Sequence, residues 1–193
     1  KKAFFLTGTD AHGKKIETAA EKKGINVQAF VDERAAEFKD TFQALALDYD
    51  RFIRTTDSDH VTVVQRVLQR VYERGDIYLG RYQGLYCVDC EAYYTDDELK
   101  DGICPLHFKP VELLEEECYF FRLSRFQEAL LKHYRENRDF IMPETRRREM
   151  ESFVSRGLKD FAISRSTFKW GIPLPFDSNH VTYVWFDALL NYL

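Results

Sequence analysis

The sequence is short of several features, and each shortage excludes a class of protein. Its 193 residues contain no apolar run of the roughly 20 residues that a membrane helix needs, and no secretory signal pattern. Lysine and arginine total 28 against 32 aspartates and glutamates, so the formal net charge is -4. That balance excludes a broadly basic nucleic-acid binder but leaves room for a local basic face. We expect no DNA partner and no membrane association.

Repeats and low-complexity segments are also absent, and the chain is 45% hydrophobic and 15% aromatic. Such a chain can bury a sizeable core. Its length suits one large domain or a domain that carries an insert.

Cysteine is scarce as well, but three of the four cysteines stand in an informative pattern. Cys87-x2-Cys90 is followed, after 13 residues, by Cys104-x2-His107. Three thiolates and one imidazole can close a tetrahedral shell around Zn²⁺ with no open position, as in structural zinc sites. We therefore predict a structural zinc held by these four residues. The fourth cysteine, Cys118, is left over; an odd thiol beside a zinc site indicates a reducing compartment, and we expect a cytoplasmic protein.

Two other interpretations of the pattern are weaker. Four unrelated residues, three of them ordinary buried thiols, rarely produce a doubled pair at this spacing, and a redox C-x2-C would not need the second pair. Between the pairs, Thr95–Glu98 resembles a capping box and Asp101–Gly102 a turn. Together they would fold the second pair back onto the first.

The first residues have the pattern of a βα unit. An apolar strand is predicted over Ala3–Thr7, bounded by Gly8, and a helix over Lys14–Lys23, stopped by Gly24. Ligands of such units bind at the carboxyl ends of the strands, where Asp10 would lie. A helix N-cap is an equally good interpretation of Asp10, and His12 is interpreted as a surface or supporting histidine.

Helical periodicity and extended texture then alternate. A helix is predicted over 27–47 and another after Thr56 as N-cap, whose stripe of Val61, Val64, Leu68 and Val71 indicates core. The inward positions predicted for the first of these helices are Ala29, Phe30, Ala36, Phe38, Phe42 and Leu45.

A small β module is predicted next, too short for its own core and stabilised by metal instead. It comprises an aromatic β segment at 77–86, the zinc pairs, and two short strands within 111–122 around an acidic run. Ser124 with Gln127 predicts a capping box for the following helix. The run Arg146–Arg148 lies in a helix predicted over 143–156; it suits either a tRNA or phosphate contact or, more simply, a solvated helix face.

In the last part of the chain, the residue pattern predicts extended segments over 161–165 and 170–175 and a strand over 181–186. A helix follows, with Asp187 as its N-cap. Core packing is the simpler interpretation of Trp185 and Tyr192.

Three pieces of this sequence occur in an order that resembles one family. They are Gly8-Thr9-Asp10-Ala11-His12-Gly13, the zinc pairs, and Ile163-Ser164-Arg165 followed by Trp170-Gly171-Ile172-Pro173 and Tyr183-Val184-Trp185-Phe186-Asp187-Ala188. Collinear over the whole chain, they resemble the catalytic core of the methionyl-tRNA synthetase family, a class I aminoacyl-tRNA synthetase.

The resemblance implies an α/β fold in which a Rossmann-type parallel sheet is interrupted by a small zinc-bound β insert. Residues 1–77 would form the first part of the catalytic domain, 78–156 the connective insert with its zinc knuckle and helices, and 157–193 the return to the catalytic domain. The family motif His-Ile-Gly-His belongs upstream of Lys1, and Lys-Met-Ser-Lys-Ser downstream of Leu193. Because these motifs hold the ATP phosphates, the chain resembles a middle part of the core that would be inactive alone.

The resemblance also implies the reaction and its participants. The family charges tRNA(Met) with methionine through methionyl-adenylate, using ATP with Mg²⁺, and no side chain of this chain needs to act as a nucleophile. By resemblance Asp10 binds the methionine ammonium and Arg165 pairs with Asp10. Four further residues would surround the methionine side chain: Trp185, Ala188, Leu189 and Tyr192. Leu189 stands where some relatives carry proline, which leaves the contour of this pocket open.

Two alternatives of other classes compete. A zinc-ribbon RNA-binding module would explain the cysteines and the arginine run but not Asp10, Arg165 and Trp185 in their places. A nucleotide-binding oxidoreductase needs G-x-G-x-x-G after a strand, and residues 8–13 lack that spacing.

Overall fold

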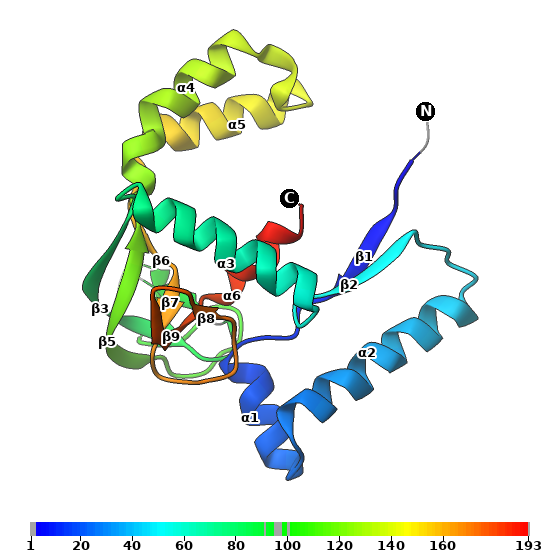
Figure 1. Ribbon diagram of the computed structural model, residues 1–193. Coiled ribbons are helices and arrows are strands. Elements are labelled where there is room, and N and C mark those ends of the chain that lie inside the picture. The colour runs from blue at the N-terminus through cyan, green and yellow to red at the C-terminus, as the bar shows by residue number, and fades with distance from the viewer. Residues whose placement is uncertain (1–2, 91, 95–97, 100, 193) are drawn as a thin grey trace.

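The computed structural model describes residues 3–90, 92–94, 98–99 and 101–192. Among these residues three small sheets are joined and flanked by helices (Figure 1). The predicted α/β class is confirmed, and one of the sheets is parallel. Within the described ranges, no helix is both long enough and apolar enough to pass through a membrane.

The parallel pair consists of β1 (Leu6–Thr9) and β2 (Arg51–Arg54), in register from Leu6 opposite Arg51 to Thr9 opposite Arg54. β1 runs through Gly8, which the sequence analysis placed at the boundary of the strand. A Cβ on Gly8 would lie 1.8 Å from the carbonyl oxygen of Ile53. This glycine therefore serves the close approach of the two strands and does not end one of them.

Two helices connect these strands (Figure 1): α1 (Lys14–Lys23) and α2 (Val27–Ala44). α1 ends as predicted at Gly24, whose φ of 67° is left-handed. The inward face predicted for α2 is mostly wrong. Phe30 is buried, but the other buried residues are Val31 and Ala35, while Phe38 is exposed.

The core forms around α3 (Ser58–Glu73), whose N-cap is Asp57 and not the predicted Thr56. The predicted stripe is confirmed: Val64 and Leu68 are fully buried, and Val61 and Val71 pack at the margin. Burying each such side chain stabilises the fold by about 1.5–3 kcal/mol. The other buried members of this cluster are Ile77, Tyr119, Ile163, Ile172 and Leu174.

An antiparallel sheet follows, in the order β4-β3-β5-β6. The two short strands predicted within 111–122 are wrong, because one continuous strand pairs with β3 from Ile77 opposite Phe121 to Tyr86 opposite Glu112. Alternation explains how the acidic run fits a strand: its middle member, Glu116, is buried and the glutamates on either side are exposed. The strands are β3 (Ile77–Cys87), β4 (Ala92–Tyr94), β5 (Glu112–Phe121) and β6 (Phe161–Ala162). The predicted capping box at Thr95–Glu98 involves 95–97, which lie outside the described residues, whereas the turn at Asp101–Gly102 is present.

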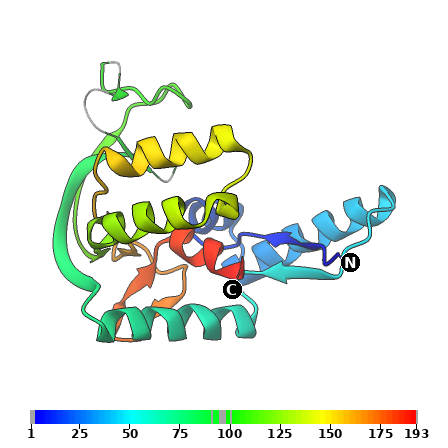
Figure 2. The same cartoon turned by 90° about the horizontal axis from the view of Figure 1, so that it is seen from above.

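Helices α4 (Gln127–Glu136) and α5 (Glu144–Ser155) lie side by side, which Figure 2 shows from above. The predicted capping box is wrong. The Ser124 hydroxyl donates to the Asp160 carboxylate at 2.6 Å, and the Gln127 side chain accepts from the backbone N–H of Leu158 at 2.7 Å.

The arginine run lies on α5 and is paired within that helix. Arg147 binds Glu144 and Glu151, and Arg148 also binds Glu144. Arg146 pairs with Glu149. These contacts favour the simpler interpretation, a solvated helix face.

The last sheet has the order β7-β9-β8, with β7 (Ser164–Arg165), β8 (Pro173–Leu174) and β9 (Asp177–Thr182). The strand predicted over 181–186 is wrong in its second half, because α6 (Val184–Leu189) begins there with Tyr183 as N-cap. The Tyr183 carbonyl accepts from the N–H groups of Phe186 and Asp187, which starts the helix. Asp187 is therefore not the N-cap.

Candidate functional site

A cavity of about 220 Å³ lies along β1 and reaches the loop at its carboxyl end. Three of the predicted site residues line it: Asp10 on one side, and Ala188 and Tyr192 on the other. Parallel strands direct their carboxyl ends to one edge of a sheet, which explains why the loop after β1 forms one wall. The remaining lining residues are Leu6, Thr7, Gly8, Thr9, Ile53, Thr55 and Asn191.

A second cavity, of about 340 Å³, meets the first at Asp10. It shares Gly8, Thr9 and Asp10 with the first cavity; its other walls come from Ala11, Ile16 and α2 and are apolar apart from Arg34. Asp10 thus borders both spaces. Because the N-cap of α1 is Gly13, the interpretation of Asp10 as the helix cap is wrong.

The other predicted pocket residues lie elsewhere. Trp185 is 55% and Leu189 60% exposed, and neither is among the residues that line the two cavities. Tyr192, which does line the first, is still 79% exposed. Their predicted contacts with a methionine side chain stay predictions.

Arg165 is buried in β7, and its contacts come from three sides. Its Nε lies 3.4 Å from Oε1 of Glu116, its Nη1 donates to the Ser164 carbonyl at 2.8 Å, and its guanidinium stacks 4.2 Å from the centre of the Tyr183 ring. A planar guanidinium suits this combination of ion pair and ring stacking. Glu116 was not predicted as a partner of Arg165, and the predicted pairing of Arg165 with Asp10 stays a prediction.

The loop that carries Asp10 is held by hydrogen bonds to distant segments. The N–H of Ala11 donates to the Thr55 hydroxyl at 2.9 Å, and the Trp170 indole donates to the Ala11 carbonyl at 2.6 Å. Gly13 donates from its N–H to the Trp170 carbonyl at 3.2 Å. Each of these bonds satisfies a backbone N–H or carbonyl group that would otherwise be buried without a hydrogen-bond partner.

A buried carboxylate adds a further hold on this loop. Asp187 Oδ2 lies 2.7 Å from Nδ1 of His12, and its Oδ1 lies 2.6 Å from Nε2 of His60. All three residues are buried. This bridge was not predicted from the sequence, in which Asp187 has the pattern of a helix cap and no role was assigned to His60. His12 is buried, so it is not a surface histidine, and its contact with Asp187 fits the other interpretation, a supporting histidine.

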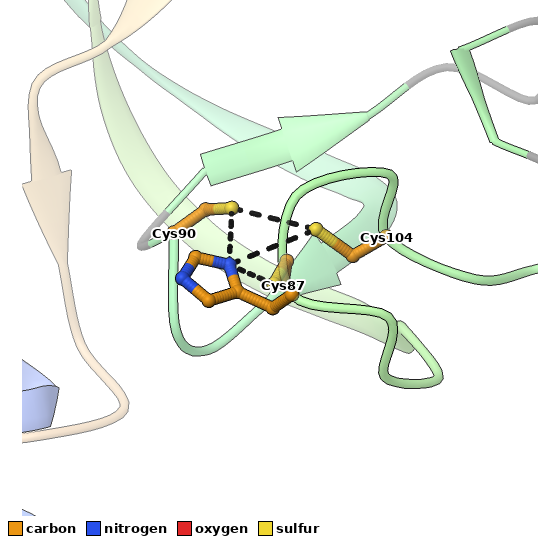
Figure 3. A group of neighbouring side chains, drawn as sticks. Cys87, Cys90 and Cys104 are labelled. Atoms are coloured by element: carbon orange, nitrogen blue, oxygen red, sulfur yellow. Dashed lines mark hydrogen bonds between the residues drawn. The ribbon is translucent and has the colours of Figure 1, made fainter.

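The predicted metal ligands come together at the far end of β3 (Figure 3), where Cys87, Cys90 and Cys104 point toward one another. The four candidate ligand atoms of these cysteines and His107 all lie within 4.8 Å of one another. His107 Nδ1 is 3.1 Å from the sulfur of Cys90, 3.9 Å from that of Cys104 and 4.0 Å from that of Cys87. A tetrahedral zinc ion bound by sulfur and nitrogen places its ligand atoms roughly 3.3–3.8 Å apart, so the group could hold such an ion.

The electrostatics of the cluster suit a cation. Burial alone would raise the pKa of the Cys104 thiol, but hydrogen bonds from His107 and Leu106 lower that pKa to about 5. Burial raises the pKa of Cys90 to about 11. The thiolate form of Cys104 is thus already favoured, while the Cys90 thiol would lose its proton on binding the ion.

The comparisons with known proteins agree with this geometry. The chain matches the family described as tRNA synthetases class I (M) over residues 1–112 and 98–193. The methionine–tRNA ligase of Caldanaerobacter subterraneus subsp. tengcongensis is 51% identical over 190 residues, covering 98% of this chain and 30% of that protein. The corresponding protein of Thermosynechococcus vestitus is 51% identical, covering 98% of this chain and 36% of that protein.

Solved structures give the same result. Mycobacterium tuberculosis methionyl-tRNA synthetase in complex with methionyl-adenylate superposes with a TM-score of 0.89 at 46% identity, covering 98% of this chain and 38% of that one. Its free form superposes with a TM-score of 0.72 over 85% of this chain. The chain spans about a third of the length of these relatives. It belongs to the methionine family of class I tRNA synthetases.

Proposed function

We propose that the full-length protein containing this chain joins methionine to ATP as methionyl-adenylate and then charges tRNA(Met). This chain would supply the methionine pocket and a zinc-bound insert. One observation carries the proposal: Asp10, Ala188 and Tyr192, which resemblance assigns to methionine, line one cavity that reaches the carboxyl end of β1. The proposed division is 1–77 and 157–193 for the catalytic domain and 78–156 for the connective insert.

Asp10 would bind the methionine ammonium, a charge-assisted contact. Ala188 and Tyr192 would contact the methionine side chain, together with Trp185 and Leu189. A thioether gains about 0.3–1.5 kcal/mol beside an aromatic edge, which favours methionine over a branched aliphatic side chain. Arg165, held by Glu116 and the Tyr183 ring, would keep Asp10 oriented.

The reaction needs these residues to position the substrate. The methionine carboxylate would attack the α-phosphorus of ATP and pyrophosphate would leave. A ribose hydroxyl of the terminal adenosine of the tRNA would then attack the methionyl carbonyl, losing its proton, and AMP would leave. Mg²⁺ bound with ATP would supply charge neutralisation. The contribution of this chain is orientation and binding, which can lower such a barrier substantially without a nucleophilic side chain.

The metal would be zinc, and its role structural. Cys87, Cys90, Cys104 and His107 provide four ligands, which leaves no open position for water or substrate. The ion would fix the turn that follows β3. With its reduced thiols, the protein would work in the cytoplasm.

The test is methionine-dependent exchange of pyrophosphate into ATP, together with charging of tRNA(Met), measured on the full-length protein. We expect exchange with methionine and background rates with leucine. Equal exchange with both amino acids would contradict the assigned pocket, and no exchange with either would contradict the proposed reaction.

A further inference from the structure

We propose that Asp187 is a positioning residue for methionine recognition: by bridging His12 and His60 it fixes the distance between the two walls of the β1 cavity. This inference rests on the proposed function. It adds three residues that lie outside the predicted pocket set.

The bridge joins three segments that are far apart in the sequence. Asp187 lies in α6, His12 in the loop after β1, and His60 in the first turn of α3. An aspartate carboxylate offers acceptors only, so each imidazole presents an N–H to it: Nδ1–H from His12 and Nε2–H from His60. The carboxylate is 0% exposed and both histidine side chains are almost fully covered, so water does not compete for these bonds.

Two members of the bridge, His12 and Asp187, are close in sequence to residues that line the cavity. His12 follows Asp10 by two residues, and the backbone of Ala11 between them is fixed by Thr55 and Trp170. The contact of the His12 imidazole with Asp187 is thus a further restraint on the short loop that carries Asp10. On the other side, Asp187 is the immediate neighbour of Ala188.

His60 connects both walls to the core. It lies on the helix whose Val64 and Leu68 are fully buried, so the helix cannot shift without disturbing the core. The loop that carries Asp10 and the helix α6 are thus both connected to the rigid helix α3 through the Asp187 carboxylate. A site that must hold an ammonium and a thioether at a set separation needs such support, since small displacements of a binding group cost affinity.

Replacements that keep or lose a single N–H test the bridge. In His12→Asn the side-chain amide can occupy the place of Nδ1, the nitrogen that contacts Asp187, whereas in His12→Gln the amide lies near the place of Nε2. His60 contacts Asp187 through Nε2, so His60→Gln is the conservative change there and His60→Asn the disruptive one. We expect His12→Gln and His60→Asn to lower kcat/KM for methionine about tenfold. The conservative variants, His12→Asn and His60→Gln, should stay within about threefold of wild type. The KM for ATP should be nearly unchanged in all four variants.

His180→Ala is the control. His180 is also buried and also contacts a carboxylate, that of Asp177 at 3.0 Å, but both of these residues lie in β9, and neither is adjacent in sequence to a residue that lines a cavity. We expect it to lower the thermal midpoint while leaving methionine kinetics unchanged. If the His12 and His60 variants do the same, the bridge is merely structural and the proposal is wrong.

A double-mutant cycle adds a second test. If His12 acts through Asp10, His12→Gln should change kcat/KM by less than about twofold once Asp10→Ala is present. Full additivity would overturn the inference. Wild-type exchange is measured in the same series, so a failure of the proposed function is recognised separately: without wild-type activity the reaction, and not the bridge, is at fault.

Discussion

Loss of the metal should open one short segment of the chain and leave its neighbours intact. The perturbation is Cys90→Ser, which removes one of the four candidate ligands. Apolar burial cannot replace the ion there, because Leu106 is 69% and Phe108 81% exposed. Structural zinc contributes about 10–16 kcal/mol of apparent binding free energy in small domains that fold on metal, so losing a ligand should be decisive locally.

The boundaries of the opened segment follow from the strand register. β3 and β5 pair continuously, from Ile77 opposite Phe121 to Tyr86 opposite Glu112. Ile77 and Tyr119, at the first end of this ladder, are buried in the core. The ladder should therefore persist, and opening should be confined to about 87–110. The assay is hydrogen exchange on peptides from 87–110, from β5 and from α3, combined with metal analysis of protein purified without added zinc.

We expect about one zinc in wild type and much less in Cys90→Ser. Cys118→Ser is the control, because Cys118 is a fully buried thiol that lies outside the cluster; this variant should keep its zinc. Full zinc in Cys90→Ser would refute the ligand set. Unchanged exchange protection in metal-free protein would refute the claim that the metal holds this segment.

Three more predictions concern the methionine pocket, the parallel sheet and the activity of the 193-residue chain alone. In the full-length protein, Asp10→Ala should lower kcat/KM for methionine at least about tenfold, since a charge-assisted hydrogen bond contributes ~1.5–3 kcal/mol; normal methionine kinetics would contradict its assigned role. Gly8→Ala should lower the free energy of unfolding by more than about 3 kcal/mol, because its Cβ would meet the Ile53 carbonyl, whereas Gly24→Ala, in open space, should cost only about 1–2 kcal/mol; urea titration distinguishes the two. The 193-residue chain alone should show background pyrophosphate exchange, since by resemblance the ATP phosphates are held outside it, and clear activity would show that the ATP site has been misplaced.

The features that the sequence predicted well have local causes. α1 ends at Gly24 because glycine adopts a left-handed φ readily, and α3 presents Val64 and Leu68 to the core because their spacing matches the helical period. The cysteine spacing predicted that four possible metal ligands would gather for a similar reason: short pairs bring their own side chains together. In each case a few neighbouring residues determine the outcome.

The predictions that failed involve polar side chains whose partners are distant. Ser124 has the pattern of a helix cap, yet its hydroxyl bonds Asp160; Asp187 has the same pattern, yet its carboxylate bonds His12, 175 residues away. Glu116 resembles a strand break until its pairing with Arg165 is known. Nothing local in the sequence distinguishes a side chain that caps its own helix from one that reaches another element.

The short parallel sheet has a consequence for how this chain behaves in solution. Next to β1 and along α2, several large apolar side chains are exposed: Phe4, Phe5, Phe38, Leu45 and Leu47. β1 and β2 pair with each other and, among the described residues, with no further strand. Open strand edges beside an apolar surface favour association between copies. Light scattering from the separately expressed chain should therefore rise steeply with concentration and fall when the adjoining parts of a full-length protein are restored.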